Sequence, residues 1–344
     1  MLASIGSVVV AVAVTIVDRR RAAVLAVRRL AAARGGSAPR YAGRMTDRSP
    51  STAGAPGGQA VLAGRPVARM GFGAMQLPGP GVLGPPADRD QAVAVLRRAV
   101  ELGVTHIDTA QFYGPDVANE LIAEALHPYP AELVLVSKVG ARRDDQGGWL
   151  EAQRPEDLRA GVEANLRSLR LDQVPVVNLR RHPNTDVPFA EQVDAMVALR
   201  DEGLVGAVGL SNVTLEQYQA ARSATEVACV QNAYNVAQRD DQPLFDACAK
   251  AGVPYVPFFP LGSAFQDHNP VLGHPDVRAA AAALDVKPAQ VALAWLLHQA
   301  ATVLLIPGTS SLAHLEQNVA AADLRLDPGL LAVLDAAVTD DRTG

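Results

Sequence analysis

Short apolar runs and longer amphipathic stretches alternate along the chain from Val67 onward. The short runs are rich in Val, Leu and Ile and are mostly apolar on both faces, which is typical of parallel strands covered by helices. This pattern predicts eight strands. They span residues 70–75, 104–108, 133–138, 174–179, 205–211, 227–231, 253–258 and 302–307.

The stretches between the strands carry the start and stop signals of helices. Residues 89–103 end in a glycine, and residues 154–170 and 287–299 each have a proline just inside the start. Repeated strand–helix units indicate a closed barrel or an open, doubly wound sheet. An open dinucleotide-binding sheet should show G-x-G-x-x-G after its first strand, but GFGAMQ at residues 71–76 lacks the third glycine. We therefore predict an α/β fold, a (β/α)8 TIM barrel with a short N-terminal β-hairpin at residues 59–71 on the barrel floor.

The segment before the hairpin does not share this alternation. It holds an apolar run at residues 7–17, followed by arginines and then by a stretch rich in Ser, Pro and Gly. The run is shorter than the roughly 20 residues that a spanning helix needs. Two interpretations stay open: a disordered tail or a misplaced translation start with the true start at Met45, and a short apolar anchor with a cytoplasmic flank. We divide the chain into an extension, residues 1–58, and a barrel domain, residues 59–344.

Composition and charge narrow the classes of function. The 344 residues are 49% hydrophobic and carry a net charge of -5, so no basic face for nucleic acid is expected. Cys229 and Cys248 belong to no CxxC or Cys/His cluster, which indicates buried, reduced thiols of a cytoplasmic protein and no metal site. The expected state is a monomer or small homo-oligomer, with a membrane partner only if residues 7–17 are an anchor.

Three residues with complementary chemistry follow neighbouring strands. Asp108 ends the second predicted strand, Tyr113 lies in the loop after it, and Lys138 ends the third. In (β/α)8 barrels, catalytic groups gather at these C-terminal strand ends. A lysine there needs an anion such as Asp108, and its charge is expected to lower the pKa of the tyrosine hydroxyl, as suits a general acid for carbonyl reduction. A purely structural ion pair, or an aldolase-like Schiff-base lysine, stays open on these residues alone.

A longer motif relates the chain to a known family. The segment GVTHIDTAQFYGPDVANELIAEAL at residues 103–126 resembles the motif of the aldo-keto reductase superfamily, and the resemblance extends from about residue 59 to residue 339. It implies that Asp108, Tyr113 and Lys138 are the first three members of the catalytic group.

The usual histidine of that group has two candidates in NLRRHP at residues 178–183. A gapless match places Arg180 at this position, whereas a two-residue slip places His182 there. Strand alternation puts both side chains on one face, so both stay open. Arg180 would be a permanent cation that orients the carbonyl oxygen without acting as an acid.

The resemblance also implies a nicotinamide cofactor, NADPH by default. Where the family usually has basic residues around the 2′-phosphate, this chain has Gly308 and His314, so NADH is the alternative. Phe258 occupies the place of the aromatic residue that stacks on the nicotinamide. The cofactor contacts implied are Gly73, Ser211, Asn212, Gln231, Phe258, Leu261, Gly262, Gly308, Thr309, His314 and Asn318.

We therefore expect NADPH-dependent reduction of a small aldehyde or ketone to the alcohol. The segment at residues 71–86 is most similar to the bacterial pyridoxal reductase-like branch, which implies a pyridoxal-like or aromatic aldehyde. The alternative is a redox-sensing, cofactor-binding subunit resembling potassium-channel β subunits. The expected substrate-pocket residues are Met75, Leu77, Phe112, Trp149 and Phe259.

Overall fold

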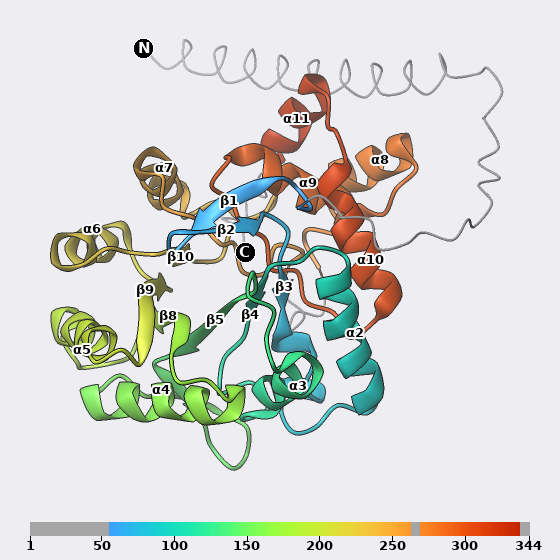
Figure 1. Cartoon of the computed structure of the whole chain (residues 1–344). Coiled ribbons are helices and arrows are strands. Elements are labelled where there is room, and N and C mark those ends of the chain that lie inside the picture. The colour runs from blue at the N-terminus through green and yellow to red at the C-terminus, as the bar shows by residue number, and fades with distance from the viewer. Residues whose placement is uncertain (1–54, 263–268, 338–344) are drawn as a thin grey trace, which may run out of the picture.

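A computed structural model of the chain describes residues 55–262 and 269–337. The apolar run at residues 7–17 and the alternative start at Met45 lie outside the described residues, as does most of the proposed extension. At the centre is a curled sheet of six parallel strands in the order β10-β9-β8-β5-β4-β3, with helices around its outside (Figure 1). The predicted α/β class is confirmed.

The described strands are mostly short. The central sheet contains β3 (Phe72–Gly73), β4 (His106–Asp108), β5 (Val134–Val139), β8 (Val174–Arg180), β9 (Val205–Ser211) and β10 (Val230–Gln231). Two further pairs are antiparallel, namely β1 (Gln59–Leu62) with β2 (Arg65–Ala68), and β6 (Ala141–Arg143) with β7 (Trp149–Glu151).

The last two predicted strands continue the sheet through single parallel bridges. Val230 of β10 pairs with Tyr255, Tyr255 pairs with Val303, and Leu305 pairs with Met70 just before β3. The segments at residues 253–258 and 302–307 therefore lie in the sheet positions predicted for the seventh and eighth strands, but neither forms a continuous ladder of backbone hydrogen bonds. The second strand is also shorter than predicted, because the backbone N–H of Val104 is bonded to Ala99 O at the end of the preceding helix (3.1 Å).

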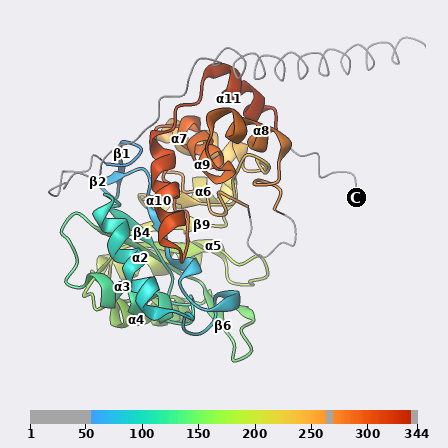
Figure 2. The ribbon, with the colours of Figure 1, turned by 90° about the vertical axis from the view of Figure 1, so that its right-hand side faces the viewer.

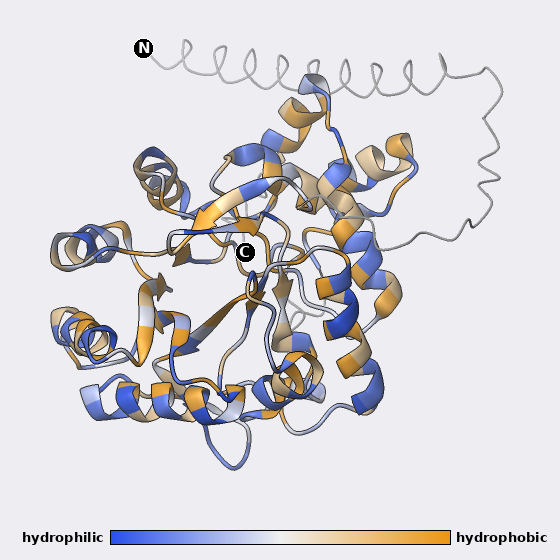
Figure 3. Cartoon of the chain, viewed as in Figure 1, coloured by the Kyte–Doolittle hydropathy of each residue, from blue (hydrophilic) through white to orange (hydrophobic). Residues whose placement is uncertain are grey.

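Helices cover the outer face of the sheet. They are α2 (Arg89–Glu101), α3 (Val117–Leu126), α4 (Pro155–Leu169), α5 (Phe189–Asp201), α6 (Leu215–Ala224), α7 (Gln242–Ala251), α8 (Pro275–Leu284), α9 (Pro288–Gln299), α10 (Leu312–Ala320) and α11 (Pro328–Asp335). In the helices that pack on the sheet, such as α4 and α5, apolar residues face inward and polar residues face outward (Figure 3), whereas α8 and α11 pack against neighbouring helices. The first and last parts of the chain meet where α2 and α10 lie side by side (Figure 2), joined by an Arg98–Glu316 ion pair of 3.0 Å.

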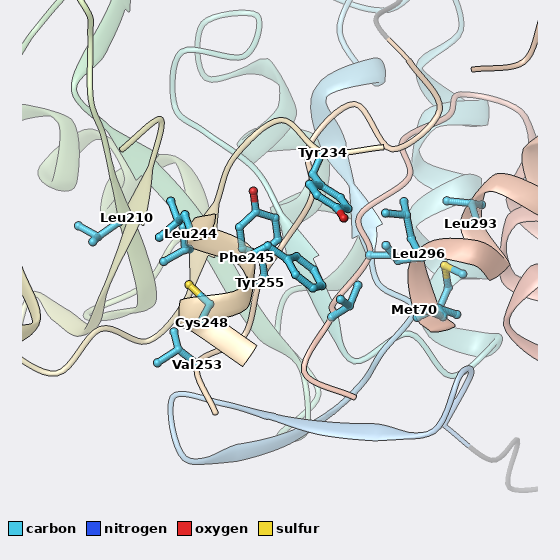
Figure 4. Packing of buried hydrophobic residues seen from close by; sticks show 14 of the residues in the cluster. Met70, Leu210, Tyr234, Leu244, Phe245, Cys248, Val253, Tyr255, Leu293 and Leu296 are labelled. Atoms are coloured by element: carbon cyan, nitrogen blue, oxygen red, sulfur yellow. The ribbon is translucent and has the colours of Figure 1, made fainter. Parts of the chain in front are cut away.

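Aromatic residues fill the core between the sheet and α7 and α9. Tyr234 stacks on Phe245 with ring centres 4.9 Å apart and on Trp295 at 6.1 Å, while Tyr255 packs edge-on against Phe245 (Figure 4). The Tyr255 hydroxyl donates to Asp241 over 2.5 Å, so its buried polar end is satisfied. Such close packing holds the loops above this part of the sheet in fixed positions.

The β1–β2 hairpin packs against the beginnings of the central strands. Leu62 and Val67 are buried in a cluster with Val134 of β5 and Val176 of β8. The Ala68 N–H donates to the hydroxyl of Thr105, just before β4, over 2.7 Å. The hairpin therefore lies at the opposite end of the strands from Asp108 and Lys138.

Two further sequence expectations can be compared with the described residues. Cys229 and Cys248 are free and buried, as predicted. Within residues 55–262 and 269–337, no single helix is long and apolar enough to cross a membrane, and α8 with α9 meets that criterion only as a pair bent by 99°.

A histidine is buried in β4, two residues before Asp108. His106 in β4 is 1% exposed, and its ring fills the space beside Gly71, where an added Cβ would lie 2.1 Å from Nε2. Burial lowers the pKa of His106 to about 4, although the backbone of Ala68 and Leu305 opposes the shift. The folded protein therefore holds this ring neutral.

Replacing His106 with asparagine should flatten the acid side of the stability profile. In the wild type, the unfolded chain takes up this proton near its usual pKa of 6.5 and the folded protein only near 4, so stability falls as the pH falls between these values. This one group accounts for a loss of about 3 kcal/mol between pH 7 and pH 4. Urea unfolding at both pH values checks this, and an equal pH dependence in wild type and variant contradicts it.

Candidate active site

The strand register brings the predicted residues to one end of the sheet. Gly73 lies opposite Asp108, and Asp108 is followed by the loop that carries Tyr113. On the other side of β5, Arg180 at the end of β8 lies opposite Ser211 of β9, which in turn lies opposite Gln231 of β10. The C-terminal strand ends therefore form a continuous arc of polar side chains, as expected for a parallel sheet of this kind.

A buried ion pair occupies the centre of this arc. Lys138 Nζ donates to Asp108 Oδ1 over 2.5 Å and to the carbonyl oxygen of Thr109 over 3.0 Å, and both charged side chains are at most 5% exposed. Burial alone would lower the pKa of Lys138, but the charges of Asp108 and Tyr113 and their hydrogen bonds raise it above its usual value. Lys138 is therefore a protonated cation, which does not fit an aldolase-like nucleophile.

Tyr113 lies against this pair. It is 6% exposed, and Lys138 Nζ is 5.0 Å from its ring centre. Burial raises the pKa of Tyr113 above its usual value, while the charge of Lys138 lowers it in part and that of Arg180 lowers it further. The expectation of a lowered pKa is therefore wrong for the protein without ligands. The cation acts in the predicted direction, but loss of hydration in a buried site outweighs it.

The second oxygen of Asp108 is held by Gln231. Gln231 Nε2 donates to Asp108 Oδ2 over 2.8 Å, so the aspartate is bonded from two sides. Gln231 was predicted as a cofactor contact, and its Oε1 and the second proton on Nε2 are left for that role. Its backbone oxygen accepts from the N–H of Asn212 over 3.2 Å, with Asn212 at φ 56°, a left-handed conformation that asparagine tolerates. The same network thus fixes Asp108, Gln231 and the loop after β9.

Arg180 and His182 have different surroundings. The Arg180 guanidinium lies 5.7 Å from the Trp149 ring centre. Its positive charge is close enough to Tyr113 to lower the pKa of the tyrosine hydroxyl in part. Its Nη1 is buried and has no hydrogen-bond partner among the described residues. His182 is turned into its own loop, where Nδ1 accepts from the backbone N–H of Asn184 over 3.3 Å. Of the two, Arg180 is the one that the structure brings to Tyr113.

A buried glutamine that the sequence did not single out supports Arg180. Gln153 is fully buried, and its Nε2 donates to Gly140 O over 2.6 Å and to Arg180 O over 2.7 Å. Its Oε1 accepts from the N–H of His182 over 3.2 Å. Gln153 therefore joins the loop after β5 to the end of β8. No local motif marks it, because its three partners are backbone groups distant in sequence.

Trp149 lies beside these residues, although it is not among the residues that line the neighbouring cavity. Its ring lies 4.2 Å from Arg143 Cζ and packs edge-on against Phe112 at 5.7 Å, and Phe112 in turn meets Tyr113 at 5.4 Å. Arg143 also donates to the carbonyl oxygens of Gly147 and Val82. The β6–β7 hairpin that carries Trp149 is thereby tied to the loop after β3.

A cavity of about 300 Å³ opens next to Tyr113. Its lining includes most of the predicted cofactor residues together with Met75 and Phe259: Gly73, Met75, Gln76, Asp108, Tyr113, Gln231, Phe258, Phe259, Pro260, Leu261, Gly262, Asn269, Ile306, Pro307, Gly308, Thr309 and Ser310. Four predicted contacts do not line it, namely Ser211, Asn212, His314 and Asn318. Leu77 and Phe112 are wrong as pocket residues, because both are buried in the apolar core.

The donor set of this cavity fits a nicotinamide dinucleotide. The amide of Gln231 and the ring of Phe258 suit a planar carboxamide-bearing ring. At the other end, Thr309 and Ser310 precede α10, whose N-terminus is capped by the Ser311 hydroxyl accepting from His314 N. A helix start with nearby hydroxyls favours a phosphate.

Comparison with known proteins agrees with this geometry. The model of the Aldo/keto reductase family matches residues 69–339. A curated relative, pyridoxine 4-dehydrogenase from Escherichia coli (strain K12), is 48% identical over 280 residues, which cover 80% of this chain and 96% of the relative. The chain belongs to the aldo/keto reductase family.

Solved structures of aldo/keto reductases from Klebsiella pneumoniae have the same fold. One, in complex with NADP and acetate, is 30% identical with a TM-score of 0.68, and the match covers 81% of this chain and 94% of that one. Another, in complex with NADPH, is 29% identical with a TM-score of 0.69, covering 83% and 97%.

Proposed function

We propose that this protein reduces small aldehydes or ketones to alcohols, with Tyr113 as the proton donor. One observation carries the proposal. The Tyr113 ring lines the cavity and lies against the buried Asp108–Lys138 ion pair. A tyrosine hydroxyl placed beside a cation can give its proton to a developing alkoxide, because the cation stabilises the tyrosinate that remains.

Each residue then has a defined part in the reaction. NADPH, when bound, supplies the hydride to the carbonyl carbon. Tyr113 donates its proton to the carbonyl oxygen, and its raised pKa keeps it protonated before the reaction. Lys138 stabilises the resulting tyrosinate, Asp108 holds Lys138 in place, and Arg180 donates a hydrogen bond to the carbonyl oxygen.

The cofactor assignment rests on the lining residues and on the relatives. Gln231 would bind the carboxamide together with Ser211 and Asn212, and Phe258 would stack on the ring, with Gly73, Leu261 and Gly262 beside it. The phosphates and adenosine would lie toward Gly308, Thr309, His314 and Asn318. NADPH is supported by the Klebsiella pneumoniae proteins, which bind NADP and NADPH. NADH stays the alternative, because this chain has Gly308 and His314 at the positions where the family usually carries lysine or arginine for the 2′-phosphate.

A pyridoxal-like or aromatic aldehyde is the proposed substrate. The name of the Escherichia coli relative, pyridoxine 4-dehydrogenase, supports this class. Met75 and Phe259 line the cavity. Trp149 does not line it but lies close by, packed edge-on against Phe112, which in turn meets Tyr113. Planar faces of this kind favour a planar substrate.

The complete architecture belongs to the same proposal. The bridges from Val230 through Tyr255, Val303 and Leu305 to Met70 support closure of the sheet into a (β/α)8 barrel. The burial of Leu62 among inward-facing strand residues supports the hairpin as the barrel floor. The division at residues 58 and 59 and a cytoplasmic location stay predictions.

A redox-sensing regulatory subunit is the less favoured alternative. The intact set of Asp108, Tyr113 and Lys138 and the dehydrogenase among the relatives both support turnover. A subunit that only binds the cofactor has no need of a proton donor held in this way.

Replacing Tyr113 with phenylalanine should remove reduction and leave NADPH binding nearly intact. Loss of a positioned general acid lowers the rate by about 10²–10⁴-fold. NADPH oxidation with pyridoxal and 4-nitrobenzaldehyde measures the rate, and nicotinamide fluorescence measures binding. Tyr129→Phe is the matched control, since its hydroxyl bonds to Leu169 O away from the cavity. A Tyr113→Phe variant that keeps most of its turnover refutes the assignment.

The pair Arg180→Met and His182→Ala should separate the two carbonyl-orienting candidates. With 4-nitrobenzaldehyde, loss of the charged hydrogen bond from Arg180 is expected to lower kcat/KM by about 10- to 100-fold. His182→Ala should change it by less than about 3-fold, because His182 bonds within its own loop. The opposite ranking would assign the role to His182.

A further inference from the structure

Arg180 carries a charge that no carboxylate in the described part of the chain balances. Asp108, the acidic residue at the neighbouring strand ends, is bonded to Lys138 and Gln231 instead. The ion pairs among the described residues do not include Arg180. A cation that is largely removed from water without a partner is costly, so this position points to an anion supplied by a ligand.

The guanidinium also has more donors than the proposed reaction uses. It presents five N–H groups in a planar fork, and one of them suffices for a carbonyl oxygen. Nη1 of Arg180 is sealed from solvent and has no hydrogen-bond partner in residues 55–262 and 269–337, whereas the residue as a whole is only partly buried, so the donors open to a ligand are on the other guanidinium nitrogens. A planar fork is best satisfied by two oxygen atoms lying side by side, one of them ionised.

We propose that Arg180 binds two substrate oxygens at once: the carbonyl oxygen, and a phenolate oxygen on the adjacent ring carbon. The site would then select aromatic aldehydes with an ortho hydroxyl group. This inference rests on the proposed reductase function and specifies its substrate class. Pyridoxal, proposed above, has its ring hydroxyl on the carbon next to the one that bears the aldehyde. The phenolate oxygen takes no part in the reaction and leaves unchanged with the alcohol.

The surroundings of Arg180 suit a flat aromatic ring. Trp149 is 38% exposed, and its ring centre lies 5.7 Å from Arg180 Cζ, so an apolar face lies next to the fork. Arg143 Cζ lies 4.2 Å from the centre of the Trp149 ring, and the Arg143 guanidinium is itself held by hydrogen bonds to Gly147 O and Val82 O. Gln153 holds the backbone of Arg180 over 2.7 Å. The fork and the apolar face are thus both positioned by the protein before any substrate binds.

A substrate series tests the pairing. The full-length protein is assayed with NADPH and 2-hydroxybenzaldehyde, 2-methoxybenzaldehyde or 4-hydroxybenzaldehyde, and kcat/KM is compared between wild type, Arg180→Met and Arg180→Lys. The ratio of 2-hydroxy to 2-methoxy compound should fall by about 10-fold or more in Arg180→Met, because a charged hydrogen bond is lost. Arg180→Lys keeps the charge without the fork, so its ratio should also fall. Arg142→Met, on the exposed face of the same region, should leave every ratio unchanged.

A second readout does not depend on turnover. With NADP in place of NADPH, 2-hydroxybenzaldehyde bound to the wild type should show more phenolate absorbance at a given pH than when bound to Arg180→Met. Equal absorbance in the two proteins, or equal substrate ratios, overturns the inference. If Arg180→Met fails to fold, Arg180→Lys decides by both readouts. Failure to reduce any aldehyde, 4-nitrobenzaldehyde included, overturns the proposed function, and the absorbance comparison then decides this inference separately.

Discussion

The burial of one positive charge is the constraint on which the site depends. Lys138 lies next to the end of β5, a strand that is buried along its whole length, and its ammonium group is stable there because Asp108 and the carbonyl oxygen of Thr109 accept its hydrogen bonds. Removing either charge would leave the other buried and unpaired, which is strongly unfavourable. The pair therefore fixes both side chains, and Tyr113 is held against a cation that cannot move away.

Hydrogen bonds link the Lys138–Asp108 pair to the ends of the other strands. Asp108 has its second oxygen bonded by Gln231, so the ion pair is linked across the sheet to β10 and to the loop after β9. On the other side, Gln153 ties the end of β8 to the loop after β5 and so places Arg180. Two cations therefore act on one buried phenol, which is an arrangement that stabilises negative charge on oxygen during carbonyl reduction.

The sequence predicted the parts of this arrangement that depend on strand order. Asp108 and Lys138 end adjacent strands, so their pairing follows from the alternation of strands and helices alone. The pKa direction of Tyr113 could not be predicted, because it depends on how completely the ring is buried. Nor could the different surroundings of Arg180 and His182, because His182 accepts a hydrogen bond from the Asn184 N–H within its own loop. Leu77 and Phe112 failed as pocket residues for a related reason, since apolar side chains look alike in the sequence whether they face a cavity or the core.

The coupling between Lys138 and Tyr113 is the central claim, and an alkaline absorbance titration of the Tyr113 phenol tests it most directly. The signal is isolated as the difference between each protein and its Tyr113→Phe counterpart, in the wild-type and Lys138→Met backgrounds without cofactor. Because burial raises the pKa of Tyr113 and Lys138 opposes that shift, the midpoint should lie above 10 in the wild type and higher still in Lys138→Met. The same midpoint in both backgrounds would contradict the account, since Lys138 would then have no electrostatic effect on the proposed acid.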